Sequence, residues 1–155
     1  MRVGLGYDSH CFAEGRQLVL GGVSIDYPRG LDGWSDADAA THALIDALCG
    51  AASLGDIGTL FPAGDIRYQD ACSLKLLEQT AHEVKNRGLV IGNVDITVVV
   101  QEPVLAPHVP RMRAALAAAL GVDEERVSVK AKTNEHMGFV GRGEGIAAIA
   151  VALLE

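Results

Sequence analysis

The chain has 155 residues, enough to bury a substantial core, and we expect one catalytic domain over residues 1–155. Hydrophobic residues make up 49% of the chain and charged residues 21%, a balance that argues against intrinsic disorder. The formal net charge of −7 argues against a nucleic-acid partner, because such binding depends on Lys and Arg neutralising phosphates.

The three cysteines, Cys11, Cys49 and Cys72, are odd in number and contain no C-x-x-C pair. This pattern is typical of reduced thiols in a cytoplasmic protein. The N-terminus lacks the charged and apolar regions of a signal peptide, and no apolar run approaches the roughly 20 residues of a membrane-spanning helix. We therefore expect a cytoplasmic protein with no membrane partner.

The first half of the chain predicts two strands, one helix and a long loop. Residues 1–7 and 17–23 have the apolar and β-branched composition of strands. Residues 36–52 are expected to form a helix, with Ser35 as the candidate N-cap. Residues 54–70 contain several Gly and one Pro, which predicts an irregular loop, and loops of this length are often functional.

The second half predicts two helices and three strands. Residues 73–87 form an amphipathic helical pattern, and residues 109–120 form an Ala-rich helix closed by a glycine. Residues 90–101 are rich in β-branched side chains, and residues 127–133 alternate between apolar and polar positions, as in a half-exposed strand. Residues 145–154 are nearly all apolar, which predicts a strand buried on both faces.

This order of elements predicts an α+β or α/β sheet with helices on one face. Of the two we expect the α+β class, with a four- or five-stranded mixed sheet. The apolar residues at consecutive positions in 98–100 and 145–154 predict that the other face of the sheet is apolar too. Homo-oligomerisation is the economical way to cover such a face.

Three separated polar residues form a candidate metal site. In an extended strand the side chains of Asp8 and His10 point to the same face, and His42 shares a helix face with Asp38 and Asp46. One carboxylate and two imidazoles suit Zn²⁺, with a fourth position open to water or substrate. An Asp-x-His triplet alone is weak evidence, since a single helical His is more often packed or solvated than bound to metal.

Five motifs follow one another along almost the whole chain. They are VGLGYDSH at 3–10, SDAD at 35–38, HALIDAL at 42–48, GDIG at 55–58 and GFVGRGEGI at 138–146. Together they resemble the 2-C-methyl-D-erythritol 2,4-cyclodiphosphate synthase family of the non-mevalonate isoprenoid pathway. The resemblance implies a lyase that cyclises 4-diphosphocytidyl-2-C-methyl-D-erythritol 2-phosphate and releases CMP.

The resemblance also implies an assembly and its cofactors. It implies a homotrimer whose sheets face the threefold axis, with active sites between subunits that bind an anionic cytidine-diphosphate substrate. Asp8, His10 and His42 would hold a tetrahedral Zn²⁺ with one open position. Glu135 would bind Mg²⁺ or Mn²⁺ through the substrate phosphates. In some family members the central channel binds an isoprenoid diphosphate.

The resemblance assigns further roles position by position. Ser35, Thr133 and Glu135 would be catalytic, and Asp46 would orient the imidazole of His42. The substrate-binding positions would be Asp8, His10, Ser35, Asp56, Gly58, Phe61, Asp65, Val100, Leu105, Ala106, Ala131, Lys132, Thr133, Phe139 and Arg142. Within this set, Asp56 and Gly58 correspond to contacts with the methylerythritol hydroxyls. The cytosine pocket corresponds to Val100, Leu105, Ala106 and Ala131.

Phe139, Arg142 and Glu144 correspond to residues that line the central channel. Three Arg142 side chains around one axis repel one another, so either a bound anion or Glu144 must offset their charge. A structural alternative is that Arg142 and Glu144 simply pair across subunits.

Three positions depart from the family pattern. Trp34 stands where the family usually has His, and an indole donates one hydrogen bond but cannot titrate. The usual acid after Phe61-Pro62 is missing, and Asp65 is the nearest replacement. Lys132 replaces a hydroxyl residue near the nucleotide site.

Two other functions stay open at this point. A zinc hydrolase would use the open metal position to activate water and would release inorganic phosphate or a linear product. A trimeric sensor would keep a structural metal and bind a lipid diphosphate in its channel. Structural zinc normally has four protein ligands, and the sequence provides no evident fourth.

Overall fold

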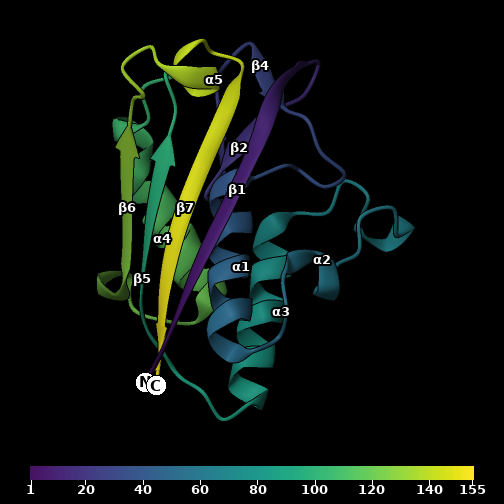
Figure 1. The fold of residues 1–155 in the computed structure, drawn as a ribbon, viewed down its shortest axis with the longest axis vertical. Helices are drawn as coiled ribbons and strands as arrows, with labels where there is room; N and C mark the ends of the chain where they lie inside the picture. Colours follow the sequence, from purple (N-terminus) through teal and green to yellow (C-terminus); the bar gives the residue numbers. More distant parts are fainter.

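A mixed five-stranded sheet runs through the molecule, and three helices cover one of its faces (Figure 1). The computed structural model describes residues 1–155. Its strands are β1 (Arg2–Glu14), β4 (Arg29–Leu31), β5 (Ile91–Val99), β6 (Val127–Lys132) and β7 (Gly145–Leu154). Across the sheet they lie in the order β4-β1-β7-β5-β6. Only β5 and β6 pair in parallel. The predicted α+β class, with a mixed sheet and helices on one face, is confirmed.

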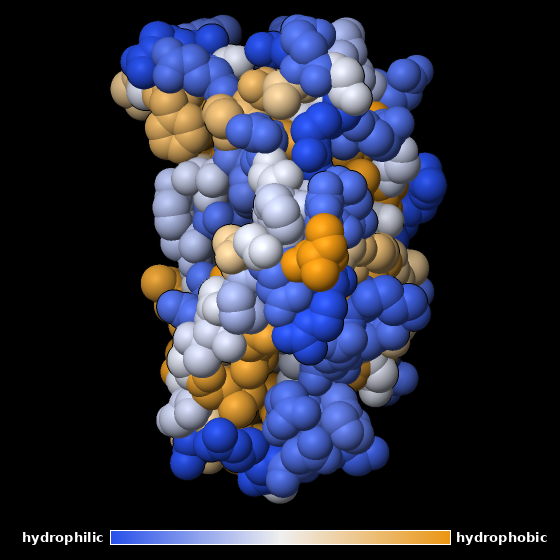
Figure 2. Space-filling model, turned by 90° about the vertical axis from the view of Figure 1, so that its right-hand side faces the viewer, coloured by the Kyte–Doolittle hydropathy of each residue, from blue (hydrophilic) through white to orange (hydrophobic).

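The long helices are α1 (Ala39–Ala52), α3 (Ser73–Asn86) and α4 (Val109–Leu120). Short elements connect the rest: α2 (Ile57–Leu60), α5 (Gly138–Gly141), η1 (Ile66–Tyr68), η2 (Ala106–His108) and η3 (Glu124–Arg126). None of the helices is both long enough and apolar enough to cross a lipid bilayer. The side of the molecule that carries α2 is mainly hydrophilic, with separate hydrophobic patches (Figure 2).

Two strand predictions were wrong in extent. The first strand extends to Glu14 because its second half pairs with β7 and then with β4. The single strand predicted over 17–23 is split into β2 (Leu18–Leu20) and β3 (Val23–Ile25), which form a separate hairpin. Gly21 and Gly22, with φ of 54° and 72°, adopt the left-handed conformation that this tight turn requires.

The N-cap of the first helix is Asp38 and not Ser35 as predicted. Ala37, with φ of 57°, turns the chain so that the helix begins later. Asp38 accepts hydrogen bonds from the amide and hydroxyl of Thr41, at 3.0 and 2.7 Å, and from the amides of Gly21 and Gly22, at 2.8 and 2.7 Å. This buried carboxylate therefore caps α1 and also anchors the β2–β3 hairpin against it.

Strand β1 and helix α1 lie in direct backbone contact. A Cβ added at Gly4 would lie 1.9 Å from the carbonyl oxygen of Ala47, and one added at Gly6 would lie 1.9 Å from that of Ala43. Only glycine permits this approach. Because side chains alternate along a strand, Asp8 and His10 follow Gly4 and Gly6 on the face that meets α1.

The opposite face of β1 and β7 is apolar and open to solvent in the single chain. Val3, Leu5 and Tyr7 are 66%, 68% and 52% exposed. Their neighbours Ile149 and Val151 on β7 are 40% and 38% exposed. The prediction that the last strand is buried on both faces is therefore wrong for its second half within one chain.

The contact between β1 and α1 predicts opposite effects for two Gly→Ala substitutions. Gly4→Ala should lower the free energy of unfolding by about 3 kcal/mol, since the added methyl meets helix backbone that cannot move aside. Gly50→Ala, on the exposed side of α1 with nothing within 4 Å of its added Cβ, should raise it by about 0.5–1 kcal/mol. Urea denaturation measures both, and a Gly4→Ala protein as stable as the parent would refute the close packing.

Candidate metal centre and its cavity

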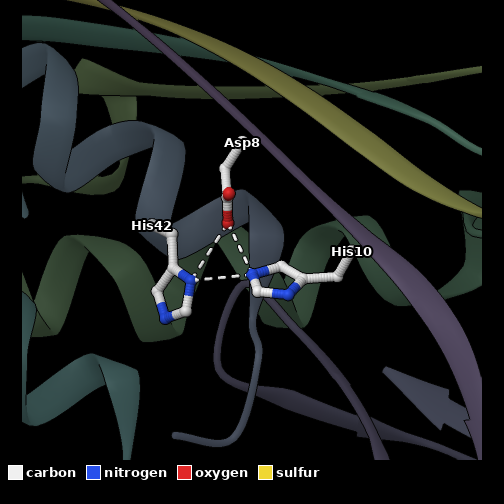
Figure 3. A group of neighbouring side chains, drawn as sticks. All are labelled: Asp8, His10 and His42. Atoms are coloured by element: carbon white, nitrogen blue, oxygen red, sulfur yellow. Dashed lines mark hydrogen bonds and ion pairs between the residues drawn. The ribbon is translucent and has the colours of Figure 1, made fainter. Parts of the chain in front are cut away.

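Three side chains from two elements point their polar atoms toward one another (Figure 3). Asp8 Oδ2 lies 2.8 Å from His10 Nε2 and 3.0 Å from His42 Nδ1. The two imidazole nitrogens are 3.2 Å apart. Ligands of a tetrahedral Zn²⁺ with bonds of 2.0–2.1 Å lie roughly 3.3 Å from one another. The donor set and its spacing therefore fit three corners of such a site.

The ring of His10 is held in one orientation from outside this group. Its Nδ1 lies 2.6 Å from the carbonyl oxygen of Asp32. A carbonyl oxygen can only accept, so Nδ1 carries the hydrogen and donates it. In the neutral imidazole, Nε2 then has a free lone pair directed at Asp8 and His42, as a metal ligand requires.

The site favours positive charge. Burial alone would raise the pKa of Asp8, but its hydrogen bonds with His10 and His42 outweigh burial and hold that pKa well below its usual range. Burial alone would lower the pKa of His10, but the hydrogen bond and charge of Asp8 outweigh it and raise that pKa above its usual value. The Asp8 carboxylate thus attracts either a proton on His10 or a cation bound between the three ligands.

Asp46 does not have the role expected for it. Its Oδ1 accepts a hydrogen bond from the amide of Ile57 at 2.7 Å, which ties it to the start of α2. The other ring nitrogen of His42, Nε2, instead lies 2.8 Å from Ser73 Oγ and 3.2 Å from Ser35 Oγ. The predicted contact between Asp46 and the imidazole is therefore wrong.

A cavity of about 230 Å³ lies over the three ligands. The ligands themselves form part of its wall, and the loop around α2 supplies much of the rest. The other lining residues are Trp34, Ser35, Ile57, Gly58, Phe61, Ala63, Tyr68 and Leu76. Three of the predicted substrate-binding positions, Ser35, Gly58 and Phe61, thus lie beside the candidate metal ligands.

Two acidic positions in the loop stabilise its own backbone. Asp56 Oδ1 accepts hydrogen bonds from the amide and the hydroxyl of Thr59, both at 2.7 Å, and so caps α2. Asp65 pairs with Arg67, at 2.6 Å, and caps η1. The indole of Trp34 donates to the carbonyl oxygen of Asp65 at 3.0 Å. Trp34 therefore lines the cavity and also ties the loop to it.

The remaining predicted positions lie elsewhere in the chain. β7 and β5 separate β1 from β6, which corresponds to roughly 14 Å at the usual strand spacing. At the carboxyl ends of β5 and β6 and in the segments that follow them lie Val100, Leu105, Ala106, Ala131, Lys132, Thr133 and Glu135. One chain therefore does not bring these residues to the candidate metal centre.

Local geometry distinguishes the members of this second group. Val100 and Leu105 are buried, whereas Lys132 is exposed as its place in the strand alternation predicts. The hydroxyl of Thr133 donates to Glu135 Oε1 at 2.6 Å. Glu135 has a left-handed backbone, with φ of 47°, and its side chain is exposed.

The candidate channel residues lie in and just after α5. Phe139 is partly exposed, and the guanidinium of Arg142 pairs with Glu144 of the same chain at 2.6 Å. Glu144 thus offsets the charge of Arg142 within one chain. This differs from the alternative in which the two residues pair across subunits.

Sequence reasoning missed three residues that support the ligands: Asp32, Asp36 and Ser73. Asp32 acts through its backbone carbonyl, which leaves no signal in a side-chain pattern. In the sequence, Asp36 belongs to the SDAD motif and to the expected start of a helix, and Ser73 is the first residue of the next expected helix. Their contact with the site depends on how α1 and α3 pack, and no spacing along the chain reports that packing.

Comparison with known proteins gives a consistent assignment. The model of the YgbB family matches residues 1–155. The 2-C-methyl-D-erythritol 2,4-cyclodiphosphate synthase of Moorella thermoacetica is 58% identical over 99% of this chain and 94% of its own length. A solved structure of a synthase of that name, in a CDP-bound form, has a TM-score of 0.91 and 36% identity, covering 99% of this chain and 100% of its own.

A larger solved protein contains the same unit. The bifunctional IspDF of Campylobacter jejuni superposes with a TM-score of 0.95 and 42% identity. This chain is covered over 99% of its length and spans 42% of that one. Since the family model matches residues 1–155 and the Moorella thermoacetica synthase is 58% identical over 99% of them, the chain belongs to the YgbB family.

Proposed function

We propose that this chain, as one catalytic domain, cyclises 4-diphosphocytidyl-2-C-methyl-D-erythritol 2-phosphate in isoprenoid biosynthesis. The 2-phosphate oxygen attacks the β-phosphorus, the bond from that phosphorus to the bridging oxygen of CMP breaks, and CMP leaves with the bond's electrons. The product is 2-C-methyl-D-erythritol 2,4-cyclodiphosphate. The observation that carries the proposal is the convergence of Asp8, His10 and His42 at a cavity, in a chain that its synthase relatives match over its whole length.

The ligand set supports zinc as the metal of the site. Asp8, His10 and His42 would hold Zn²⁺ with one position open toward the cavity. Bound there, zinc supplies a Lewis acid for a phosphate oxygen. Because only one of the three ligands is anionic, the site keeps a net positive charge, which favours a phosphate over a neutral ligand.

The chain's own residues enclose the reacting group. Trp34, Ile57 and Phe61 give the cavity an apolar wall that limits the access of water. Exclusion of water protects the diphosphate from hydrolysis and strengthens electrostatic interactions inside the cavity. Ser35, buried beside His42, offers a hydroxyl to the substrate's 2-phosphate.

The size of the cavity supports an active site shared between subunits. Sites for drug-sized ligands usually enclose about 300–1,000 Å³. The cavity of about 230 Å³ suits the methylerythritol phosphate end and leaves too little room for the cytidine. A neighbouring copy would supply the cytosine pocket through Val100, Leu105, Ala106 and Ala131, and the diphosphate contacts through Lys132 and Thr133.

A homotrimer would provide that neighbour and cover the apolar sheet face. Val3, Leu5 and Tyr7 with Ile149 and Val151 form the open apolar surface that such an assembly would bury. In this arrangement the sheets face the axis. Phe139 and Arg142 would line its channel, where an isoprenoid diphosphate would compete with Glu144 for the guanidinium.

Glu135 would bind a second, harder cation. Its carboxylate is exposed, and the hydroxyl of Thr133 holds it in place. Carboxylate and phosphate oxygens are the ligands that Mg²⁺ and Mn²⁺ prefer. Glu135 would hold this cation, which would supply positive charge to the substrate phosphates.

Phosphorus NMR of the full chain with Zn²⁺, Mg²⁺ and the diphosphocytidyl substrate tests the reaction. We expect two coupled signals of a cyclic diphosphate to appear together with CMP. Inorganic phosphate or a linear product would indicate a hydrolase instead. An unchanged spectrum with zinc bound would favour the sensor.

His42→Ala should remove one of three metal ligands and leave the fold intact. We expect turnover to fall by at least about 100-fold, since metal coordination contributes several kcal/mol of charge stabilisation. Zinc content, measured by atomic emission, should fall in parallel. His82→Ala, which removes an imidazole from α3 outside the ligand cluster, is the control. Full activity in His42→Ala would eliminate the zinc assignment.

Glu135→Gln should lower the affinity for the second cation, Mg²⁺ or Mn²⁺, and leave zinc binding unchanged. The amide keeps the shape of the side chain but loses its charge, so the Mg²⁺ concentration for half-maximal turnover should rise roughly tenfold, equivalent to about 1.4 kcal/mol. Zinc content should stay unchanged. Glu125→Gln, at an exposed position in η3, is the matched control. Loss of zinc together with Mg²⁺ dependence would contradict two separate cation sites.

A further inference from the structure

A buried hydrogen-bond chain lies behind the imidazole of His42. Ser73, the fully buried first residue of α3, places its Oγ 2.8 Å from His42 Nε2. The carboxylate of Asp36 contacts Ser73 twice, with Oδ1 at the hydroxyl and Oδ2 at the backbone amide, the latter at 2.9 Å. These contacts join the start of α3 to the ring that faces Asp8 and His10 on its other side.

The direction of each hydrogen bond follows from the number of hydrogens available. An ionised carboxylate only accepts, so the single hydroxyl hydrogen of Ser73 is donated to Asp36. The Ser73 oxygen therefore presents a lone pair to His42 Nε2, which must carry a hydrogen to complete the contact. In a neutral imidazole the other nitrogen, Nδ1, is then unprotonated.

We propose that Asp36 and Ser73 fix the tautomer of His42, so that the lone pair of Nδ1 always points at the metal position. Both are positioning residues, because they act only through His42. The inference extends the proposed function in that it takes zinc as the bound cation.

Without the hydrogen bonds from Ser73 and Asp36, the metal site itself would favour the opposite tautomer of His42. Asp8 Oδ2 lies 3.0 Å from His42 Nδ1, so a hydrogen on Nδ1 would make a good hydrogen bond to Asp8. That hydrogen would occupy the direction in which the metal binds. An acceptor on the far side of the ring opposes this by drawing the hydrogen to Nε2.

The surroundings hold Asp36 in place as an acceptor. It receives the amide of Ser73 in the first turn of α3, where the helix dipole favours a negative charge. Its own amide donates to the carbonyl oxygen of Ala71 at 3.1 Å. The side chain and the backbone of Asp36 are thus both tied to the segment that leads into α3.

Substitutions at Ser73 and Asp36 should change zinc affinity and the His42 tautomer together. In Ser73→Ala, Nε2 loses its principal acceptor, and zinc affinity measured by chelator competition should fall about 10- to 100-fold. Nitrogen-15 NMR of the full chain should show hydrogen on His42 Nε2 in the parent and a mixture of tautomers in the variant. Thr80→Val removes another fully buried hydroxyl from α3, and both readouts should match the parent.

Asp36→Asn tests the direction of the hydrogen bonds from His42 through Ser73, because the Ser73 hydroxyl remains in place. The Asn side chain has only one accepting oxygen, and we expect it to accept from the backbone amide of Ser73. The Asn nitrogen then faces the Ser73 hydroxyl and donates to its oxygen, so the hydroxyl hydrogen turns toward His42 Nε2. We expect hydrogen on Nδ1 and a loss of zinc affinity as large as in Ser73→Ala.

The two readouts separate this inference from the proposed function. A parent protein that binds no zinc would overturn the metal assignment, while the tautomer would still test the hydrogen-bond chain. Parent-like zinc affinity with hydrogen still on Nε2 in both Ser73→Ala and Asp36→Asn would overturn the inference. An equal loss of zinc affinity in Thr80→Val would reduce the effect to general destabilisation of α3 and would also overturn it.

Discussion

The direct contact between β1 and α1 is the constraint on which the rest of the structure depends. Gly4 and Gly6 have no side chain between strand and helix, so the two backbones meet at the carbonyl oxygens of Ala47 and Ala43. Strand alternation then places Asp8 and His10 on the same face, toward the start of the helix. Since α1 carries His42 there, the approach of two backbones sets the spacing of three ligands.

The same sheet explains why the chain contains two separate groups of candidate site residues. The metal ligands belong to β1 and α1, while the candidate nucleotide and Glu135 positions lie at the carboxyl ends of β5 and β6 or in the segments that follow. β7 separates β1 from β5, and β7 and β5 separate it from β6. The face of the sheet opposite α1 carries exposed Val3, Leu5 and Val151. An assembly that buries this face would bring the metal ligands of one copy to the candidate nucleotide positions of the next. The proposed trimer would in this way complete the site of the proposed reaction.

Sequence patterns predicted what depends on neighbours along the chain. Alternation predicted the convergence of Asp8 and His10, and the three long helices lie close to their expected positions. Tertiary contacts determined the rest. The left-handed Ala37 moves the helix cap from Ser35 to Asp38, because the buried carboxylate also receives amides from a distant hairpin. Ser73 reaches His42 only through the packing of α3 against α1, so no local pattern could predict it.

The most direct test of this account is an anomalous-difference map, measured at the zinc edge, of the protein crystallised with Zn²⁺. The account predicts one strong peak about 2.0–2.1 Å from Asp8 Oδ2, His10 Nε2 and His42 Nδ1, with a fourth position filled by water or ligand. A peak bound through His42 Nε2, a fourth protein ligand, or no peak between these residues would contradict it.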